Sequence, residues 1–243
     1  MADFSPIYGP VTSRRLGRSL GISLVPRKAC PYDCIHCTLG STTDLTIGRK
    51  SHVTPKTVIV ALIERLSKLE ESNTKINAIT IAGFGEATLN LHIRDLEALI
   101  RRETDLPVAI LTSGGLLADP ALRQEIRGFD IVMAYLHAGT PEAFRAVHRP
   151  HPVVSFEDVY AGLVSLKKEY GGRLWLEVMM CSGVTDDDRE MDFLAERIRG
   201  VDPDIVHIDT PSSPRIRHLA VSRERLNDLA RRIGERAVII VGT

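Results

Sequence analysis

Short apolar runs recur along the chain, separated by stretches in which apolar residues return every three or four positions. The runs are continuous, not alternating, which is typical of strands buried on both faces of a parallel sheet. Six of them are followed by a helical stretch, and a short seventh comes near the end. The predicted strands cover residues 20–26, 78–82, 108–112, 131–136, 174–181, 204–209 and 237–241.

The stretches between these runs have the period of an amphipathic helix. In the first of them apolar residues share one helical face from Val58 to Leu69, and Thr54-Pro55 supplies an N-cap followed by proline at the first helical position. Ser155 with Asp158 three residues later marks another helix start. The predicted helices cover residues 54–70, 91–102, 119–126, 141–147, 155–169, 187–199 and 222–233.

This alternation of strand and helix predicts an α/β fold in a single domain spanning residues 1–243. Six strand–helix units fit a partial, TIM-like (β/α)6 barrel better than a closed barrel of eight. A doubly wound open sheet is the alternative. Residues 1–19, with the turn signal Gly9-Pro10, are expected to be a loop segment, and residues from about 212 to 243 a short C-terminal extension.

The charge balance is neutral, since 31 Lys and Arg residues match 31 Asp and Glu residues. No overall field therefore attracts the chain to nucleic acid or to an anionic membrane. No apolar run approaches the ~20 residues of a membrane-spanning helix. Residues 13–17 resemble a twin-arginine export signal, but the apolar stretch behind them is too short for one. We therefore expect a cytoplasmic protein.

Three of the four cysteines lie in one eight-residue segment, as Cys30, Cys34 and Cys37. Thiolates are soft metal ligands, and three on one loop can hold three corners of an iron-sulfur cubane and leave one iron open. A disulfide fits poorly because the number is odd. Zinc is the structural alternative, although a closed zinc site needs four ligands and the adjacent His36 and Cys37 could hardly bind one ion.

The C-x-x-x-C-x-x-C spacing, with His36 before the last cysteine, resembles the signature loop of the radical S-adenosylmethionine (SAM) superfamily. The resemblance implies that Cys30, Cys34 and Cys37 hold one [4Fe-4S] cluster whose open iron chelates SAM. It implies a flavodoxin or ferredoxin as electron donor, and cleavage to methionine and a 5'-deoxyadenosyl radical that removes a hydrogen atom from the substrate. His36 is then expected to pack against the adenine of SAM.

A second loop strengthens the resemblance. The strand over 78–82 ends in Gly83-Phe84-Gly85-Glu86, where glycines let the backbone approach a ligand closely. The segment is similar to the Gly-Gly-Glu with which the superfamily holds the methionyl ammonium group of SAM, and Phe84 departs from its first glycine. These four residues are therefore candidate cofactor contacts.

Three more polar residues are expected to bind the cofactor. Thr112 and Ser113 match the place where the family uses hydroxyl or amide side chains on SAM, with an ordinary polar turn as the alternative. Glu177 lies inside an apolar strand, where a carboxylate is costly to bury without a partner. We expect it to lie near the cofactor or to pair with a helix residue.

His137 is a candidate for substrate chemistry. Residues 13–17, 83–89 and 149–152 are similar to a subgroup of small wyosine-synthase-like proteins. Where that subgroup has Ser-Leu-Asp-Ala, this chain has Tyr135-Leu136-His137-Ala138. Histidine can donate, accept or carry charge near pH 7, so the substrate is expected to differ.

Cys181 ends the strand over 174–181, far from the other cysteines. Most lone cysteines on apolar strands are small core residues. The alternative is a catalytic one, in which Cys181 donates a hydrogen atom that quenches a substrate radical.

The substrate is expected to be a small, anionic molecule, because several arginines near these loops predict a basic rim suited to a carboxylate or phosphate. These are Arg14, Arg15, Arg18, Arg145 and Arg149. A tRNA base and a glycyl-radical protein are alternative substrates, and the neutral balance argues against tRNA. Outside enzymology, an iron-sulfur redox sensor or a zinc-binding interaction module remains open.

Overall fold

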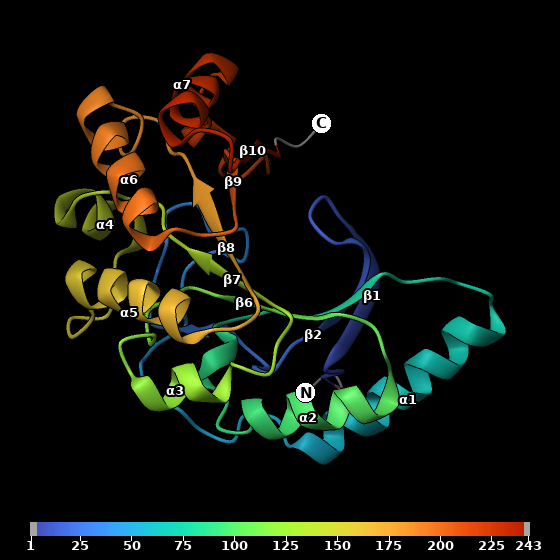
Figure 1. The fold of residues 1–243 in the computed structure, drawn as a ribbon. Coiled ribbons are helices and arrows are strands. Elements are labelled where there is room, and N and C mark those ends of the chain that lie inside the picture. Colours follow the sequence, from blue (N-terminus) through green and yellow to red (C-terminus); the bar gives the residue numbers. More distant parts are fainter. Residues whose placement is uncertain (1–3, 241–243) are drawn as a thin grey trace.

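Seven parallel strands and one antiparallel strand form a single sheet in the computed structural model, which describes residues 4–240 (Figure 1). The sheet order is β1-β2-β5-β6-β7-β8-β9-β10. The parallel strands therefore follow one another in space as in sequence, which confirms the partial barrel and excludes the doubly wound order. They are β2 (Gly17–Ile22), β5 (Ala78–Ile81), β6 (Val108–Thr112), β7 (Ile131–Tyr135), β8 (Arg173–Met179), β9 (Ile205–Asp209) and β10 (Ala237–Ile239).

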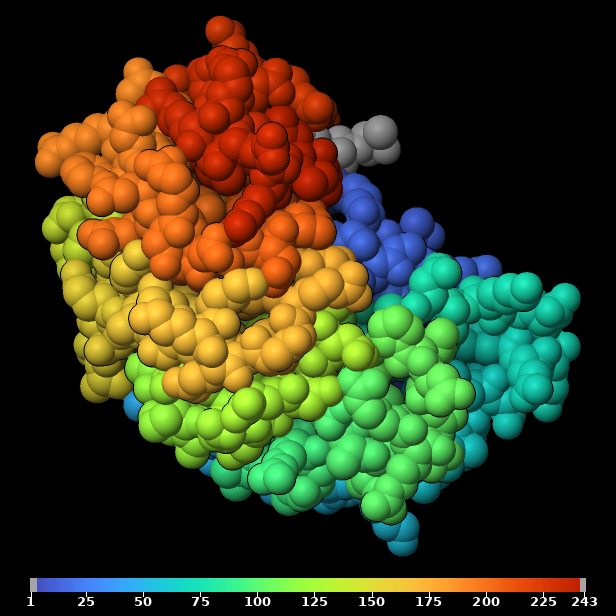
Figure 2. Space-filling model, viewed as in Figure 1, coloured from blue at the N-terminus to red at the C-terminus, as the bar shows by residue number. Residues whose placement is uncertain are grey.

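Helices cover the outer side of this sheet (Figure 1), and in the space-filling view the successive segments from green to red lie against one another (Figure 2). The capping signals are confirmed, since Thr54 Oγ1 accepts from Thr57 N–H and Ser155 Oγ accepts from Asp158 N–H. No helix within residues 4–240 is both long and apolar enough to cross a membrane. The helices are α1 (Pro55–Glu71), α2 (Ile93–Glu103), α3 (Pro120–Glu125), α4 (Pro141–His148), α5 (Phe156–Glu169), α6 (Asp188–Val201) and α7 (Arg223–Ile233), with short 3-10 turns η1 (Ala87–Leu89) and η2 (Arg217–Leu219).

The expectation of a loop over residues 1–19 is wrong for most of this segment, because β1 (Ile7–Ser13) pairs antiparallel with β2 at the edge of the sheet; residues 1–3 lie outside the described residues. The turn signal Gly9-Pro10 lies inside this strand. The register shifts between Tyr8 and Val11, and such an irregularity on an edge strand accommodates proline. The turn between β1 and β2 carries Arg14 and Arg15.

A second, two-stranded parallel sheet was not predicted. It pairs β3 (Ala29–Cys30) with β4 (Asp44–Leu45), so that the start of the cysteine loop is tied to the segment that follows it. Strands of two residues carry no periodic signal in the sequence. The pairing nevertheless defines where Cys30 lies.

The strands have two different faces. On β8, Leu174, Leu176 and Val178 belong to the main core under the helices, whereas Trp175 joins a separate inner cluster with Ala109, Ile131 and Met133. Because successive side chains point to opposite faces, Glu177 follows Trp175 on the inner face. The inner face thus changes from apolar to polar toward the carboxyl ends of the strands.

Two valines of α1 allow a matched test of this packing. Val58 is fully buried and Val60 is 51% exposed. We expect Val58→Ala to lower the free energy of unfolding by about 2 kcal/mol, from lost apolar burial and the cavity left behind. Val60→Ala is expected to change it by less than about 0.5 kcal/mol. Chemical denaturation measures both, and equal values would contradict the assignment of the buried face.

Candidate active site

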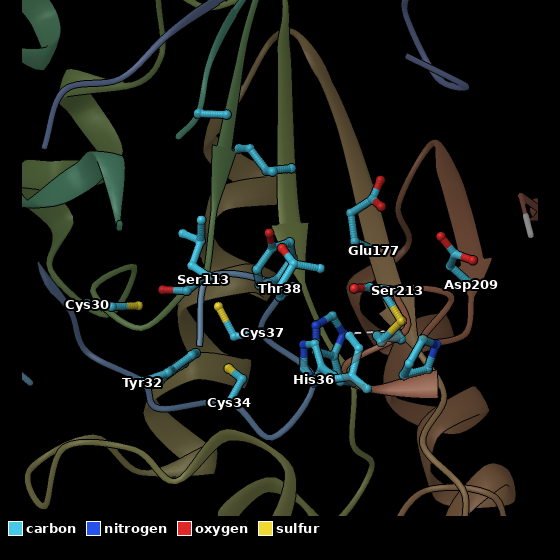
Figure 3. A pocket seen from close by; sticks show the side chains of 18 of the residues that line it. Cys30, Tyr32, Cys34, His36, Cys37, Thr38, Ser113, Glu177, Asp209 and Ser213 are labelled. Atoms are coloured by element: carbon cyan, nitrogen blue, oxygen red, sulfur yellow. Dashed lines mark hydrogen bonds between the residues drawn. The ribbon is translucent and has the colours of Figure 1, made fainter. Parts of the chain in front are cut away.

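The carboxyl ends of the parallel strands open into a cavity of about 500 Å³ (Figure 3). Functional groups of parallel α/β folds gather at this end of the sheet. The walls come from the cysteine loop and from the segments that follow β5, β6, β7, β8 and β9. Of the residues singled out in the sequence, the cavity is lined by Arg14, Arg15, Cys30, Cys34, His36, Cys37, Gly83, Gly85, Glu86, Ser113, His137 and Glu177.

The three thiols of the cysteine loop face a common space at one side of this cavity (Figure 3). None forms a disulfide. The end of α4 holds the loop, because the backbone N–H of Asp33 donates to His148 O and that of Ile35 donates to Val147 O. A helix end leaves carbonyls without an intrahelical partner, and here the cysteine loop satisfies them.

Burial controls the protonation of two of these thiols, Cys30 and Cys34. It raises the pKa of the Cys30 thiol to about 12, with a smaller contribution from the negative charge of Glu86. Burial also raises the pKa of Cys34, and the neighbouring Cys30 and Cys37 add to this. A bound cation would be needed to keep such groups as thiolates, which is the coupling expected of a metal site.

The spacing of the thiols bears on which metal group they suit. Within residues 4–240, no three His, Cys, Asp or Glu side chains converge on the position of a single ion. A tetrahedral zinc site needs such convergence. In a cubane each thiolate binds a different iron, so the ligands surround the cluster at a distance from one another.

The loop after β5 packs directly against the cysteine loop. The backbone N–H of Glu86 donates to Ala29 O at 2.9 Å, and a Cβ at Gly85 would overlap the same carbonyl oxygen. Only glycine fits there without displacing the residue that precedes Cys30. Phe84, predicted to contact the cofactor, is 48% exposed and does not line the cavity, so that prediction is wrong for its side chain.

The carboxylate of Glu86 is held by several donors. Its Oε1 accepts from Thr88 N–H at 3.0 Å, Thr88 Oγ1 at 2.7 Å and Thr112 Oγ1 at 2.8 Å, and its Oε2 accepts from Ser113 N–H at 2.6 Å. The hydroxyl of Thr112 is thereby used, and Thr112 does not line the cavity. The prediction that Thr112 contacts the cofactor is wrong, since the residue positions Glu86 instead.

Three histidines from distant segments meet beside the thiols. The ring of His137 lies 4.8 Å from that of His36 and 5.0 Å from that of His148, and His148 Nδ1 lies 3.2 Å from Cys34 Sγ. Burial lowers the pKa of His36 to about 4 and the pKa values of the other two well below the usual range, so all three are neutral near pH 7.

The histidine rings differ in their hydrogen bonds. His137 Nδ1 accepts from Met179 N–H at 3.1 Å, which places the proton of the neutral ring on Nε2. The Nδ1 atom of His36 is buried, and none of the described residues 4–240 provides a hydrogen-bond partner for it. A ligand or a water molecule in the cavity can supply the partner that this atom lacks.

The wall opposite the thiols carries paired charges. Arg15 Nε donates to Glu177 Oε1 at 2.7 Å, a second contact joins the same side chains, and His207 Nδ1 lies 2.9 Å from that oxygen. Arg14 Nη2 donates to Asp209 Oδ2 at 2.8 Å. Glu177 thus has its partners in the β1–β2 turn and on β9, and not on a helix.

His207 and the ion pair of Asp209 with Arg14 were missed in the sequence. The spacing of two residues between His207 and Asp209 on a strand places both on one face. That alternation against apolar Val206 and Ile208 was the available signal.

The expectation of one basic rim is wrong. Arg18 and Arg145 do not line the cavity, and Arg145 pairs with Glu142 on the surface. Arg149 lines a different depression.

The buried Cys181 belongs to the main core and does not line the cavity. Its backbone N–H donates to Thr185 Oγ1 at 2.9 Å, and burial raises the pKa of its thiol to about 12. A thiol that quenches a substrate radical must reach the substrate. The structure therefore supports the core interpretation of Cys181 and not the catalytic one.

Comparison with known families identifies the superfamily of this chain. The model of the radical SAM superfamily matches residues 24–195. The chain belongs to the radical SAM superfamily. Radical SAM proteins are enzymes that use a [4Fe-4S] cluster and S-adenosylmethionine.

Curated relatives extend over most of this radical SAM chain. A Brachyspira hyodysenteriae protein named GTPase Obg is 34% identical over 204 residues, which cover 84% of this chain and 29% of that protein. The UPF0026 protein MJ1312 of Methanocaldococcus jannaschii is 32% identical over 208 residues, 85% of this chain and 64% of its own length. The chain thus spans less than two thirds of either relative.

Solved structures share the radical SAM fold. A radical SAM methyltransferase from Sphaerobacter thermophilus superposes with a TM-score of 0.62 at 19% identity, covering 92% of this chain and 66% of its own. An archaeal TYW1 superposes with a TM-score of 0.60 at 14% identity, and the match covers 90% of this chain and 72% of the TYW1 chain. These likenesses confirm the partial barrel.

The network around Glu86 is testable by substitution. Glu86→Ala would leave three neighbouring residues, Thr88, Thr112 and Ser113, without their acceptor, and we expect it to lower the free energy of unfolding by about 3 kcal/mol. Glu103 is an exposed glutamate at the end of α2, so Glu103→Ala serves as the matched control with little expected change. Denaturant titration compares the two, and a small loss in Glu86→Ala would refute the structural role.

Proposed function

We propose that Cys30, Cys34 and Cys37 hold a [4Fe-4S] cluster and that SAM binds beside them in the 500 Å³ cavity. The observation that carries this proposal is the meeting of three thiols with the glycine loop that ends in Glu86. When bound, the two groups supply reductive cleavage of SAM to methionine and a 5'-deoxyadenosyl radical, which abstracts a hydrogen atom from the substrate.

The residues around the thiols fit the parts of SAM. The backbone at Gly83 and Gly85 borders the cavity and offers acceptors for an ammonium group. Ser113 lies next to it, with its N–H committed to Glu86 and its hydroxyl close to the cavity. His36, whose Nδ1 atom needs a partner, suits the adenine end.

The substrate occupies the side of the cavity toward Arg14 and Asp209 in this proposal. Arg15 is held by Glu177 through two contacts, whereas Arg14 has one hydrogen bond to Asp209 and a side chain that is 40% exposed. Arg14 is therefore the cation that an anionic group of a small substrate would meet. Asp209 beside it fits a hydrogen-bond donor or cation on the same molecule.

His137 lines the cavity on the side of the thiols, next to His36. It is neutral and carries its proton on Nε2, so it acts as a hydrogen-bond donor toward substrate or SAM. The aspartate of the similar subgroup would instead be an acceptor. This difference supports a substrate with an acceptor group near His137.

Modification of an RNA base is the second candidate. A Thermotoga petrophila relative, 27% identical over 81% of this chain and 56% of its own length, is named a probable dual-specificity RNA methyltransferase. The neutral charge balance argues for a small substrate instead, because RNA binding gains affinity from phosphate neutralisation. Binding of bulk tRNA that weakens steeply with added salt would favour RNA.

Two cysteine variants test the proposed cluster. After anaerobic reconstitution with iron and sulfide, the chain with dithionite and SAM is expected to release 5'-deoxyadenosine, and Cys34→Ala to lose both cluster absorbance and this product. Cys181→Ala removes the thiol that lies in the core and is expected to keep both. Product formation by Cys34→Ala, or a wild-type chain that binds only zinc, would contradict the proposal.

The close approach of Gly85 to Ala29 gives a second test. A methyl group at Gly85 must push the cysteine loop away, so we expect Gly85→Ala to reduce iron per chain after reconstitution and to lower the unfolding free energy by about 1–3 kcal/mol. Gly171 has nothing within 4 Å of an added Cβ, and Gly171→Ala is the control. Full iron content in Gly85→Ala would show that the contact does not position the loop.

A further inference from the structure

A second depression, of about 410 Å³, lies on the other side of the cysteine loop. It shares Cys34, Cys37 and Ile216 with the walls of the SAM cavity. The cysteine loop is therefore the partition between an inner cavity and an outer groove. The groove is lined by Asp33, Cys34, Ile35, Cys37, Gly40 and Ser41 of this loop, Ala146 and Arg149 at the end of α4, Val184, and Arg215, Ile216, His218 and Leu219 around η2.

The outer groove is basic. Arg149 and Arg215 are exposed, and neither forms an ion pair or side-chain hydrogen bond with any residue between 4 and 240. His218 lines the same groove. The one carboxylate, Asp33, is already engaged, since it accepts from Thr42 N–H at 2.6 Å and lies 3.9 Å from Lys28 Nζ.

Arg149 and Arg215 are placed by the same loop and helix that place the thiols. A Cβ at Gly40 would meet the guanidinium of Arg215, so this group lies against the backbone of the cysteine loop. Arg149 is the left-handed residue that ends α4, directly after His148, whose carbonyl accepts from Asp33 N–H. The free cations thus lie within the structure that carries Cys34 and Cys37.

We propose that this groove is the docking site of an acidic, one-electron carrier protein. The inference rests on the proposed cluster, which needs one electron from outside for each SAM cleaved. In the proposed function SAM and substrate occupy the inner face of the thiols, so the outer face is the side on which a protein carrier can approach Cys34 and Cys37. A positive groove there selects a partner with a negative surface around its redox centre.

The electron-transfer step is simple in its balance. The reduced carrier would give up one electron, and the proposed cluster held by Cys30, Cys34 and Cys37 would accept that electron. No covalent bond forms or breaks, and no proton is required. The carrier leaves after transfer, so a moderate, salt-sensitive affinity is expected.

The test compares two reductants on the same reconstituted chain. Reduced flavodoxin is the protein probe, and dithionite needs no docking surface. We expect the double variant Arg149→Glu/Arg215→Glu to raise the KM for flavodoxin at low salt about ten-fold or more and to flatten its salt dependence. Dithionite-supported release of 5'-deoxyadenosine is expected to stay unchanged. Arg94→Glu, the same reversal at an exposed site on α2, is the control.

A binding measurement provides a readout that does not depend on turnover. Calorimetric titration of the chain with oxidised flavodoxin is expected to show a matching loss of affinity in the double variant and none in Arg94→Glu. Unchanged KM and affinity would overturn the docking site, and so would an equal loss with dithionite, which would reveal a structural role. If the wild-type chain cleaves no SAM with dithionite, the proposed function fails, while the titration still decides whether the carrier docks.

Discussion

The hydrogen bonds that tie the cysteine loop to its surroundings are the constraint on which the site depends. Asp33 and Ile35 donate to the last carbonyls of α4, and Glu86 donates to Ala29 just before Cys30. Three thiols on a free loop would sample many arrangements, and ordering them costs conformational entropy that metal binding would have to offset. Here the folded backbone has already positioned them. A helix end and a glycine turn, both needed by the fold, thus prepare the metal site.

The inner face of the sheet combines burial with charge, and every buried charge on it has a partner. Glu177 is matched by Arg15, Asp209 by Arg14, and Glu86 by hydrogen-bond donors from two loops. An unpaired carboxylate in this position would be costly, so the pairing allows polar groups to line a cavity inside an otherwise apolar barrel. The paired charges form the cavity wall opposite the thiols. Such a wall can orient a substrate and limit the access of water to a reactive intermediate.

The cysteine loop separates two regions with different electrostatics. Toward the barrel the cavity is lined by balanced charges, and toward the surface the groove carries free arginines. In the functions proposed above, substrate chemistry takes place on one face of the loop and electron delivery on the other. A single segment of eight residues, from Cys30 to Cys37, is then shared by both tasks. The neutral total charge of the chain conceals this separation, because it averages over the whole surface.

The sequence by itself determined the elements of the fold and the cysteine loop, because the features that specify them are local. Hydrophobic period, caps such as Thr54 and Ser155, and ligand spacing are all read over a few residues, and the structure confirms the strands and helices that they predicted. What only the tertiary structure decided depends on which segments meet. The pairing of Arg14 with Asp209, 195 positions apart, follows from the curvature and order of the sheet. For the same reason the packing showed that Thr112 serves Glu86 and that Cys181 belongs to the core.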